Sequence, residues 1–255
     1  MKITLIGHSS VLIELAGIKL LTDPWFGVHG NLAYRRTAPA SVTRDQIGSV
    51  DAVLVSHNHW DHTDRRFLRS QPLSVPIFAP RAAAWETRLH GATHVTGLRW
   101  WQSQSLGPLR VTAVPAIHLA IPCGYVIEGE GETIYFAGDT YYGSFMRKIG
   151  QLFKLDLALL PVTTFRIPMT MGEKSAVRAV AGLAPRAVIP IHLGIQPRSP
   201  LLRTGDTPEG FKHRLASAQP LTQVVILGEG QSWTAQRSAY PTAGQTPTQA
   251  QLQIA

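Results

Sequence analysis

Cysteine is almost absent from this chain, since Cys123 is the only one among 255 residues. A disulfide within the chain and a zinc site built on paired cysteines are therefore excluded. No run of about 18 consecutive apolar residues occurs, which argues against a transmembrane helix. The short apolar run at the N-terminus is not followed by a signal-peptide cleavage pattern. Together these absences predict a soluble, cytoplasmic protein.

Acidic residues are also few: 16 Asp and Glu stand against 24 Lys and Arg, for a net charge of +8. Such a balance favours anionic partners, such as phosphorylated metabolites, phospholipid headgroups or nucleic acid. The basic residues are scattered, with small groups at Arg35–Arg36 and Arg65–Arg66 and no long run, which is typical of solvated surface charges. We therefore expect a small anionic partner rather than nucleic acid, and a homo-oligomer is possible.

The apolar pattern predicts strands in two successive runs, with helices after each run. The first run covers residues 2–6, 10–15, 18–22, 51–56 and 75–79, with helices over 64–69 and 82–89. The second covers residues 109–114, 124–128, 133–137, 155–160, 187–191 and 224–227, with a helix over 172–183. This order predicts an α/β fold of two packed sheets with helices outside.

Segments outside these elements have their own character. Residues 23–50 hold few periodic apolar positions and are expected to form a long surface loop. Residues 1–235 are expected to be one domain. Residues 236–255 are rich in Pro, Thr, Gln and Ala, which predicts a poorly ordered C-terminal tail.

The densest group of potential metal ligands is His57-Asn58-His59-Trp60-Asp61-His62, directly after the β-like run at 51–56. Side chains two apart in an extended chain point to the same face, so His57 and His59 can reach one metal together. Asp61 and His62 come after the chain has turned and can face a second metal. Imidazole and carboxylate suit zinc, with manganese or iron(II) as alternatives.

Further potential ligands lie where other predicted strands end. His118 follows strand 109–114, Asp139 follows strand 133–137, and His192 follows strand 187–191. Ligands at the carboxyl ends of separate strands can converge on one edge of a layered fold, and they join His57 there in our interpretation.

The constellation resembles the metallo-β-lactamase fold superfamily. The resemblance rests on His-x-His-x-Asp-His at 57–62, His118, Gly-Asp-Thr at 138–140 and His192, and it extends over residues 1–235. Gly7-His-Ser-Ser10, Thr22-Asp-Pro-Trp25 and Ile189-Pro-Ile-His-Leu-Gly194 are similar to the branch that contains ascorbate-6-phosphate lactonases and N-acyl-phosphatidylethanolamine phospholipase D enzymes. Tyr141 departs from this branch, which often has Gly there.

This resemblance implies an αββα four-layer sandwich of two mixed sheets with helices on the outer faces. It also implies two divalent metal ions per chain. The implied ligands are His57, His59 and His118 for the first ion, Asp61, His62 and His192 for the second, and Asp139 as a bridge between them. Asp23 occupies the position of an early aspartate that supports such sites without binding metal.

Two such ions can share a water, lower its pKa and polarise the oxygen under attack. The expected reaction is therefore hydrolysis of an ester, lactone, amide or phosphodiester by a metal-bridging hydroxide. Asp61 is the first candidate for an acid/base role, because one carboxylate oxygen can bind metal while the other orients the nucleophile. A catalytic cysteine and a Gly-x-Ser-x-Gly elbow are both missing, which removes the usual covalent alternatives.

Three alternatives stay open at this level. A nucleic-acid-processing nuclease is compatible with the pI of about 10.0, but no basic run interleaved with aromatic residues appears. A non-catalytic metal-binding regulatory protein is possible, although a complete ligand set is not expected without selection for chemistry. Mononuclear iron redox chemistry, as in sulfur dioxygenases, would leave Asp61, His62 and His192 unexplained.

Other side chains are weaker candidates. His8 could contact the metal centre from behind its ligands or could be a structural hydrogen-bonding residue. Arg35 and Arg36 could hold a substrate phosphate. Trp25, Phe26 and Tyr34 could line a pocket or serve as ordinary hydrophobic cover, and Cys123 is expected to be buried. The remaining histidines, which lack ligand spacing and are expected at the surface, are His29, His90, His94 and His213.

Overall fold

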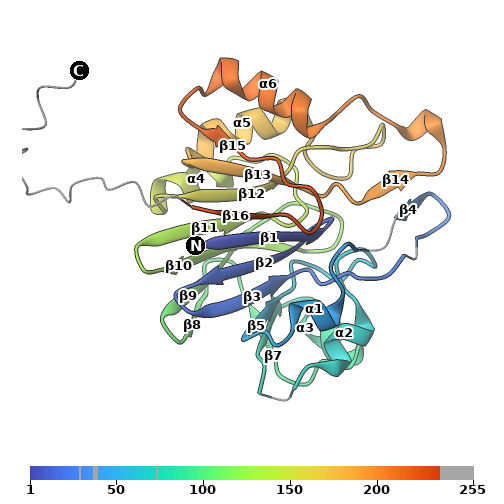
Figure 1. The fold of residues 1–255 in the computed structure, drawn as a ribbon, viewed down its shortest axis with the longest axis vertical. Helices are drawn as coiled ribbons and strands as arrows, with labels where there is room; N and C mark the ends of the chain where they lie inside the picture. The colour runs from blue at the N-terminus through green and yellow to red at the C-terminus, as the bar shows by residue number, and fades with distance from the viewer. Residues whose placement is uncertain (29, 37–39, 73, 236–255) are drawn as a thin grey trace, which may run out of the picture.

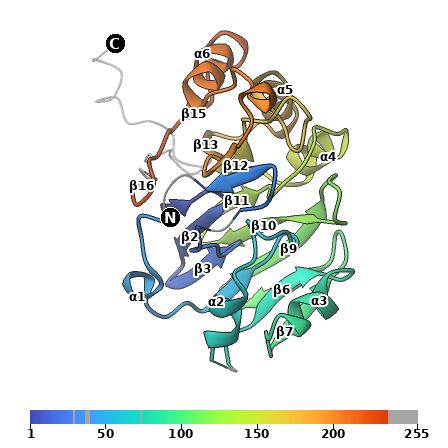
Figure 2. The same cartoon turned by 90° about the vertical axis from the view of Figure 1, so that its right-hand side faces the viewer.

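Two seven-stranded mixed sheets pack face to face, and helices cover both outer faces (Figures 1 and 2). This computed structural model describes residues 1–28, 30–36, 40–72 and 74–235. The four layers are those of an αββα sandwich, so the predicted fold class is confirmed. The expected tail at residues 236–255 lies outside the described residues.

The first sheet has the strand order β16-β1-β2-β3-β5-β6-β7. Its strands are β1 (Lys2–Gly7), β2 (Ser10–Leu15), β3 (Ile18–Thr22), β5 (Ala52–Leu54), β6 (Ile77–Pro80), β7 (Val95–Leu98) and β16 (Ser232–Thr234). β16, β1, β2 and β3 pair antiparallel, whereas β3, β5, β6 and β7 pair parallel.

The second sheet repeats this design, in the order β15-β13-β12-β11-β10-β9-β8. Its strands are β8 (Ser103–Leu106), β9 (Leu109–Pro115), β10 (Cys123–Gly129), β11 (Glu132–Phe136), β12 (Leu157–Pro161), β13 (Ala187–Ile191) and β15 (Gln223–Val224). β8 to β11 form an antiparallel meander, and β11, β12, β13 and β15 are parallel. Each sheet thus begins as hairpins and ends with parallel crossovers.

Among the described residues, three α-helices lie on each outer face. The first sheet is covered by α1 (Arg44–Ile47), α2 (Arg65–Ser70) and α3 (Ala84–Leu89), and the second by α4 (Phe145–Leu152), α5 (Glu173–Leu183) and α6 (Pro208–Ala218). α5 buries Ala176, Ala179, Val180 and Leu183, which recur at the helical period. α6 begins at Pro208 after Thr207, whose hydroxyl accepts from the Gly210 backbone N–H, a favourable N-terminal sequence.

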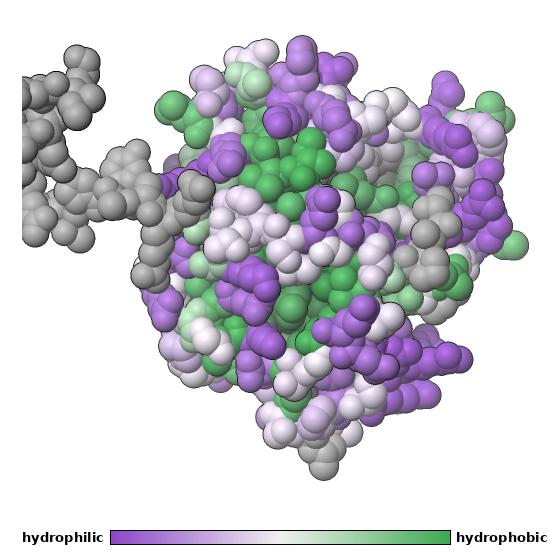
Figure 3. All heavy atoms as spheres, in the orientation of Figure 1, coloured by the Kyte–Doolittle hydropathy of each residue, from purple (hydrophilic) through white to green (hydrophobic). Residues whose placement is uncertain are grey.

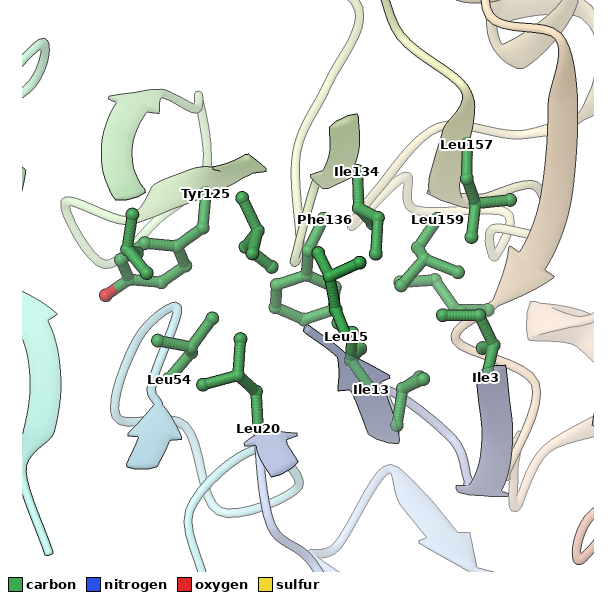
Figure 4. Packing of buried hydrophobic residues seen from close by; sticks show 14 of the residues in the cluster. Ile3, Ile13, Leu15, Leu20, Leu54, Tyr125, Ile134, Phe136, Leu157 and Leu159 are labelled. Carbon is green, nitrogen blue, oxygen red and sulfur yellow. The ribbon is translucent and has the colours of Figure 1, made fainter. Parts of the chain in front are cut away.

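The central core lies between the two sheets. Figure 4 shows Ile13, Leu20 and Leu54 of the first sheet opposite Tyr125 and Phe136 of the second. Both faces of a central strand are buried, because its alternate side chains enter different layers. In β12, for example, Leu157 and Leu159 enter the central core while Ala158 and Leu160 pack under the outer helices.

Several expectations about single segments are corrected by the structure. Residues 23–50 are not only a surface loop, because Trp25 is completely buried and α1 lies within them. The same segment contains β4 (Tyr34–Arg36), which pairs with β14 (Ile195–Pro197) in a separate small sheet. The expected strand at 224–227 pairs only over Gln223–Val224. Strands β7, β8 and β16 and helices α4 and α6 were not predicted.

A membrane-spanning helix is not found among the described residues.

Cys123 offers a direct test of the core. Its thiol is buried where β10 pairs with β9, as expected, and burial raises the pKa of Cys123 to about 12. Because the thiolate is the reactive form, we expect no alkylation of the folded protein by iodoacetamide at pH 8. One equivalent should react after unfolding in guanidinium chloride, as counted by mass spectrometry. Rapid alkylation without denaturant would contradict this packing.

Candidate metal centre

Side chains that follow six strands meet at one edge of the sandwich. They are His8 after β1, Asp23 after β3, His57 after β5, His118 after β9, Asp139 after β11 and His192 after β13. Strands that run in the same direction within a sheet end at the same edge. The pairing orders give β1, β3 and β5 one direction in the first sheet, and β9, β11 and β13 one direction in the second.

The segment after β5 turns back on itself, as its sequence predicted. The backbone N–H groups of His62 and Thr63 both donate to the carbonyl of His59, at 3.1 Å each. The side chain of Asn58 points away from the turn and binds α3, where its Nδ2 donates to the carbonyl of Ala83 at 2.9 Å. The turn therefore brings His62 beside His57 and is held from outside by a helix of the first sheet.

One group of ligand atoms consists of His57, His59 and His118. The Nδ1 atom of His59 lies 3.0 Å from His57 Nε2 and 3.2 Å from His118 Nε2. Three ring nitrogens thus point at one small volume. Burial lowers the pKa of each of these imidazoles, that of His57 most strongly, so they are neutral near pH 7 and can offer lone pairs to a cation.

A second group contains Asp61, His62 and His192, together with His8. Their ligand atoms all lie within 4.8 Å of one another. Burial raises the pKa of Asp61, but His62 and His8 outweigh that effect, so the carboxyl has a net pKa below its usual range and is ionised. This group adds His8 to the three residues that the resemblance implied, and a further group of ligand atoms joins Asp23 with His57 and His62.

Asp139 lies between the two groups. One carboxylate oxygen, Oδ2, is 3.2 Å from His192 Nε2 and 3.8 Å from His118 Nε2, while Oδ1 is 3.2 Å from His62 Nε2. Gly138 makes this approach possible, because its φ is +57° and a Cβ there would lie 2.5 Å from the Cβ of Ser56. Asp139 therefore contacts members of both groups at once.

A buried carboxylate behind the site sets the orientation of two rings. Asp23 Oδ2 accepts from Ser56 Oγ at 2.6 Å and from His62 Nδ1 at 2.7 Å. Since the Ser56 hydroxyl donates its proton to Asp23, it accepts from His57 Nδ1 at 2.9 Å. Both His57 and His62 therefore donate from Nδ1 and direct their Nε2 atoms into the site.

His8 belongs to the second group by distance, but its hydrogen bonds give it a different role. The backbone N–H of Gly194 donates to His8 Nδ1 at 3.1 Å, and burial lowers the pKa of His8 to about 3. The neutral ring must then carry its proton on Nε2, which lies 3.5 Å from Asp61 Oδ2. His8 thus presents a donor to Asp61 rather than a lone pair to a metal.

Backbone strain is concentrated here. His8, Asp23 and His192 have φ values of 54°, 36° and 66°, in the left-handed region that non-glycine residues rarely occupy. Residues in such conformations persist where the surrounding structure fixes them, and they cluster at functional sites. His192 is held by its backbone N–H, which donates to the carbonyl of His8 at 2.9 Å.

The donor set fits divalent metal ions. In the described part of the chain, His62 Nε2 and Asp139 Oδ1 are among the buried atoms without a hydrogen-bond partner. Burial lowers the pKa of His62, yet Asp139 and Asp23 outweigh it and hold that pKa well above the usual value. A cation at Nε2 would take the place of the extra proton, so the charge balance of the cluster also suits a metal.

The weaker candidates for substrate binding differ in what their side chains contact. Arg36 is buried: its Nη1 donates to the carbonyl of Trp25 at 2.7 Å and its guanidinium lies 4.5 Å from the Trp25 ring centroid, so it is not available to a substrate phosphate. Trp25 itself packs edge-on against His8 behind the site, and Phe26 packs on Phe67. Tyr34 packs on Phe165.

Among the other histidines, the expectation for His90 was wrong, because its side chain is buried on the inner side of α3. His94 and His213 are exposed, as expected, and His29 lies outside the described residues. Apolar residues flank His118 at the rim of the site, where Ile117, Leu119 and Ile121 are exposed. The ring of Tyr141 lies 6.2 Å from that of His118, so the residue that departs from the related branch is part of the same rim.

Comparison with known families agrees with this geometry. The model described as "Beta-lactamase superfamily domain" matches residues 19–193, which is more than half of the 255 residues. The chain belongs to the β-lactamase superfamily. The ligand-type residues that follow β5, β9, β11 and β13 all lie within the matched segment.

Relatives within the superfamily match almost end to end. A protein named "UPF0173 metal-dependent hydrolase" from Pelotomaculum thermopropionicum is 33% identical over 247 residues, which cover 91% of this chain and 99% of the relative. One with the same name from Pyrobaculum calidifontis is 32% identical, covering 90% and 98%. The expectation of a metal-dependent hydrolase of this superfamily is therefore confirmed.

Solved structures show the same fold. A metallo hydrolase from Ignicoccus hospitalis superposes with a TM-score of 0.74 at 24% identity, covering 92% of this chain and 99% of that one. An isothiocyanate hydrolase from Delia radicum gut bacteria gives a TM-score of 0.75 at 22% identity, with the same coverage. At these identities the comparison shows that the αββα fold is shared.

The two nitrogens of His8 can be tested separately. His8→Asn keeps an acceptor for the Gly194 N–H but loses the donor to Asp61, whereas His8→Gln keeps a donor and loses the acceptor. We expect the Asn variant to fold with a nearly unchanged Tm and to bind zinc about 10- to 100-fold more weakly, the usual effect of removing a group behind a ligand. Zinc affinity is measured by competition with a chromophoric chelator. Wild-type affinity in the Asn variant would contradict the role of the Nε2 proton.

Proposed function

We propose that this protein is a dinuclear metal-dependent hydrolase that cleaves an ester, lactone or phosphodiester of a small anionic substrate. In this proposal His57, His59 and His118 hold one ion, and Asp61, His62 and His192 hold the other. Asp139 bridges the two ions.

The observation that carries the proposal is the position of Asp139 between two converging groups of ligand atoms. Its oxygens lie 3.2 Å from His62 and from His192, which belong to the second group, and 3.8 Å from His118, which belongs to the first. Neutral imidazole nitrogens that face one another at 3.0–3.2 Å repel unless a proton or a cation lies between them. A site for a single ion would leave the ligand atoms of the other group with only one another and Asp139 as partners.

Two divalent cations bound here would lower the pKa of a water between them and polarise the substrate oxygen under attack. Zinc is the metal that we expect, because imidazole and carboxylate ligands suit it, and manganese and iron(II) are the alternatives. The chain itself supplies ring orientation: Asp23 fixes His62 directly and His57 through Ser56.

Asp61 is the proposed acid/base residue. Its carboxylate is ionised and mostly buried, and its Oδ2 lies 4.0 Å from His62 Nε2 and 3.5 Å from His8 Nε2. The donor on His8 restricts how this carboxylate can rotate. One oxygen can then face the second ion while the other holds the proton of the attacking nucleophile.

Asp61→Asn tests this role. The amide has nearly the same size but cannot accept a proton, so we expect kcat to fall about 10²- to 10⁴-fold, the usual contribution of a positioned acid/base group. The substrate would be the best one found in a screen of lactones, phosphodiesters and carboxylic esters. Circular dichroism should show a folded protein. Wild-type turnover in this variant would rule out the role.

Metal content tests the number of ions. We expect about two equivalents of zinc per wild-type chain after supplementation, measured by elemental analysis of the desalted protein. His118→Ala and His192→Ala remove a ligand from different groups, so each should retain about one equivalent, whereas the exposed control His213→Ala should retain two.

Bound metal should also stabilise the fold, because an ion that binds only the native state adds about 4 kcal/mol at a thousandfold excess over its Kd. We therefore expect a chelator to lower the Tm of wild-type protein and zinc to restore it. One equivalent or less per supplemented wild-type chain would contradict the dinuclear proposal.

A further inference from the structure

A cavity of about 490 Å³ lies on the other side of the metal-binding motif. Asn58, Trp60, Thr63 and Asp64 form one wall, and Arg44, Arg65, Arg66 and His90 form the rest. Its size is within the usual range for small-molecule sites. Arg44 comes from α1 and the two other arginines from α2, and these helices lie side by side in Figures 1 and 2.

The charge of this cavity is strongly positive. In the described part of the chain the arginines that form ion pairs are Arg36, Arg110, Arg186 and Arg214. None of the three arginines of the cavity is paired with a carboxylate of the described residues. Figure 3 shows hydrophilic side chains gathered at the lower right, over α2. Three cations thus line one solvent-filled volume, and their summed field would attract an anion into it.

The single carboxylate of the lining does not neutralise them. Asp64 Oδ1 accepts from the backbone N–H groups of Arg66 and Phe67, at 2.8 and 3.1 Å, and so caps the start of α2. The lining residues alone carry a net charge of about +2, and Glu86, whose Oε2 accepts from Asn58 Nδ2 at 3.1 Å, reduces it to about +1.

His90 is the remaining polar side chain of the lining that can contact a ligand. Only 8% of its side chain is exposed, and its Nδ1 is buried away from solvent. Its Nε2 lies 3.7 Å from Glu86 Oε1, which is too long for a hydrogen bond, so this nitrogen can serve a ligand in the cavity.

The cavity shares its wall with the metal centre. Asn58 and Trp60 alternate along the chain with the ligand-type residues His57, His59 and Asp61. Asn58 and Trp60 line the cavity, whereas the other three belong to the metal centre. Trp60 also packs edge-on against Trp25, at 5.3 Å between ring centroids. An anion bound in the cavity would therefore contact the same turn that carries the ligands.

We propose that this cavity binds the phosphate or carboxylate of a small molecule through Arg44, Arg65 and Arg66, with His90 as a further hydrogen-bonding group. Guanidinium groups bind such anions through paired hydrogen bonds. The indole of Trp60 forms an apolar side of the same cavity, suited to the organic part of the ligand. Anion binding here is independent of the proposed hydrolase function. That the anion belongs to the substrate rests on that function.

Inorganic phosphate is the first probe, titrated calorimetrically into zinc-loaded protein freed of unbound metal, at low ionic strength. We expect the double variant R65Q/R66Q to bind phosphate at least about tenfold more weakly, since it removes two charged donors. R44Q should weaken binding in the same direction. The matched control R147Q/K154Q removes two exposed charges near α4 and should stay within about twofold of wild type.

Unchanged phosphate affinity in R65Q/R66Q would overturn the proposal, because phosphate would then be bound elsewhere, for example at the metal ions. Loss of phosphate affinity in R35Q instead would show that phosphate binds at β4, which contains Arg35. Displacement of phosphate by a short single-stranded RNA, with a steep dependence on salt, would overturn the small-molecule assignment.

Two test esters separate the sources of the anion. If the cavity holds the anionic group of the substrate, R65Q/R66Q should raise KM about tenfold for 4-nitrophenyl hydrogen succinate, whose carboxylate is remote from the scissile ester. The same change should leave KM for neutral 4-nitrophenyl acetate unchanged. If it holds a separate anion, neither KM changes, and added phosphate alters kcat of wild type but not of R65Q/R66Q. If the protein hydrolyses neither ester, that result counts against the proposed hydrolase function. The phosphate titration would still test whether the cavity binds an anion.

Discussion

The hydrogen bonds of the Asp23 carboxylate are the interaction on which the site depends. Oδ1 accepts from the Ser56 backbone N–H at 2.6 Å, and Oδ2 accepts from the Ser56 hydroxyl and the His62 ring. These bonds join the end of β3 to the end of β5 and orient two imidazoles. Burial raises the pKa of Asp23 above its usual value, and the contacts with His62 and Ser56 only partly offset that effect, so the carboxylate depends on those partners to act as an acceptor.

The surrounding fold supplies the rigidity that this polar cluster needs. A buried group of histidines and carboxylates is costly to desolvate unless its members are paired with one another or with a cation. Apolar side chains on both faces of the sheets hold the strand ends in place, and three site residues are thereby kept in left-handed backbone conformations. Packing thus offsets the strain and desolvation of the site.

Local pattern was enough to predict much of the fold. Central strands such as 155–160 are continuous apolar runs because both of their faces are buried, and α5 shows the helical period because only one of its faces is. Polar or short elements were missed for the opposite reason. β16 (Ser232–Thr234) is a strand because β1 offers it backbone partners, and no apolar pattern of its own marks it. Arg36 can be buried because its guanidinium donates to the carbonyl of Trp25 and forms an ion pair with Glu229.

The sequence by itself determined which residue types stand at the strand ends and at what spacing, because periodicity along a strand and a tight turn are local properties. The tertiary structure alone decided which ring nitrogen carries each proton and which atoms meet. The acceptor state of His8 Nδ1, for instance, comes from the backbone of Gly194, 186 residues away in the chain. The basic cavity likewise exists only because α1 and α2 pack beside the motif and leave three arginines around one space. Contacts of this kind depend on how distant elements pack, and no local pattern records them.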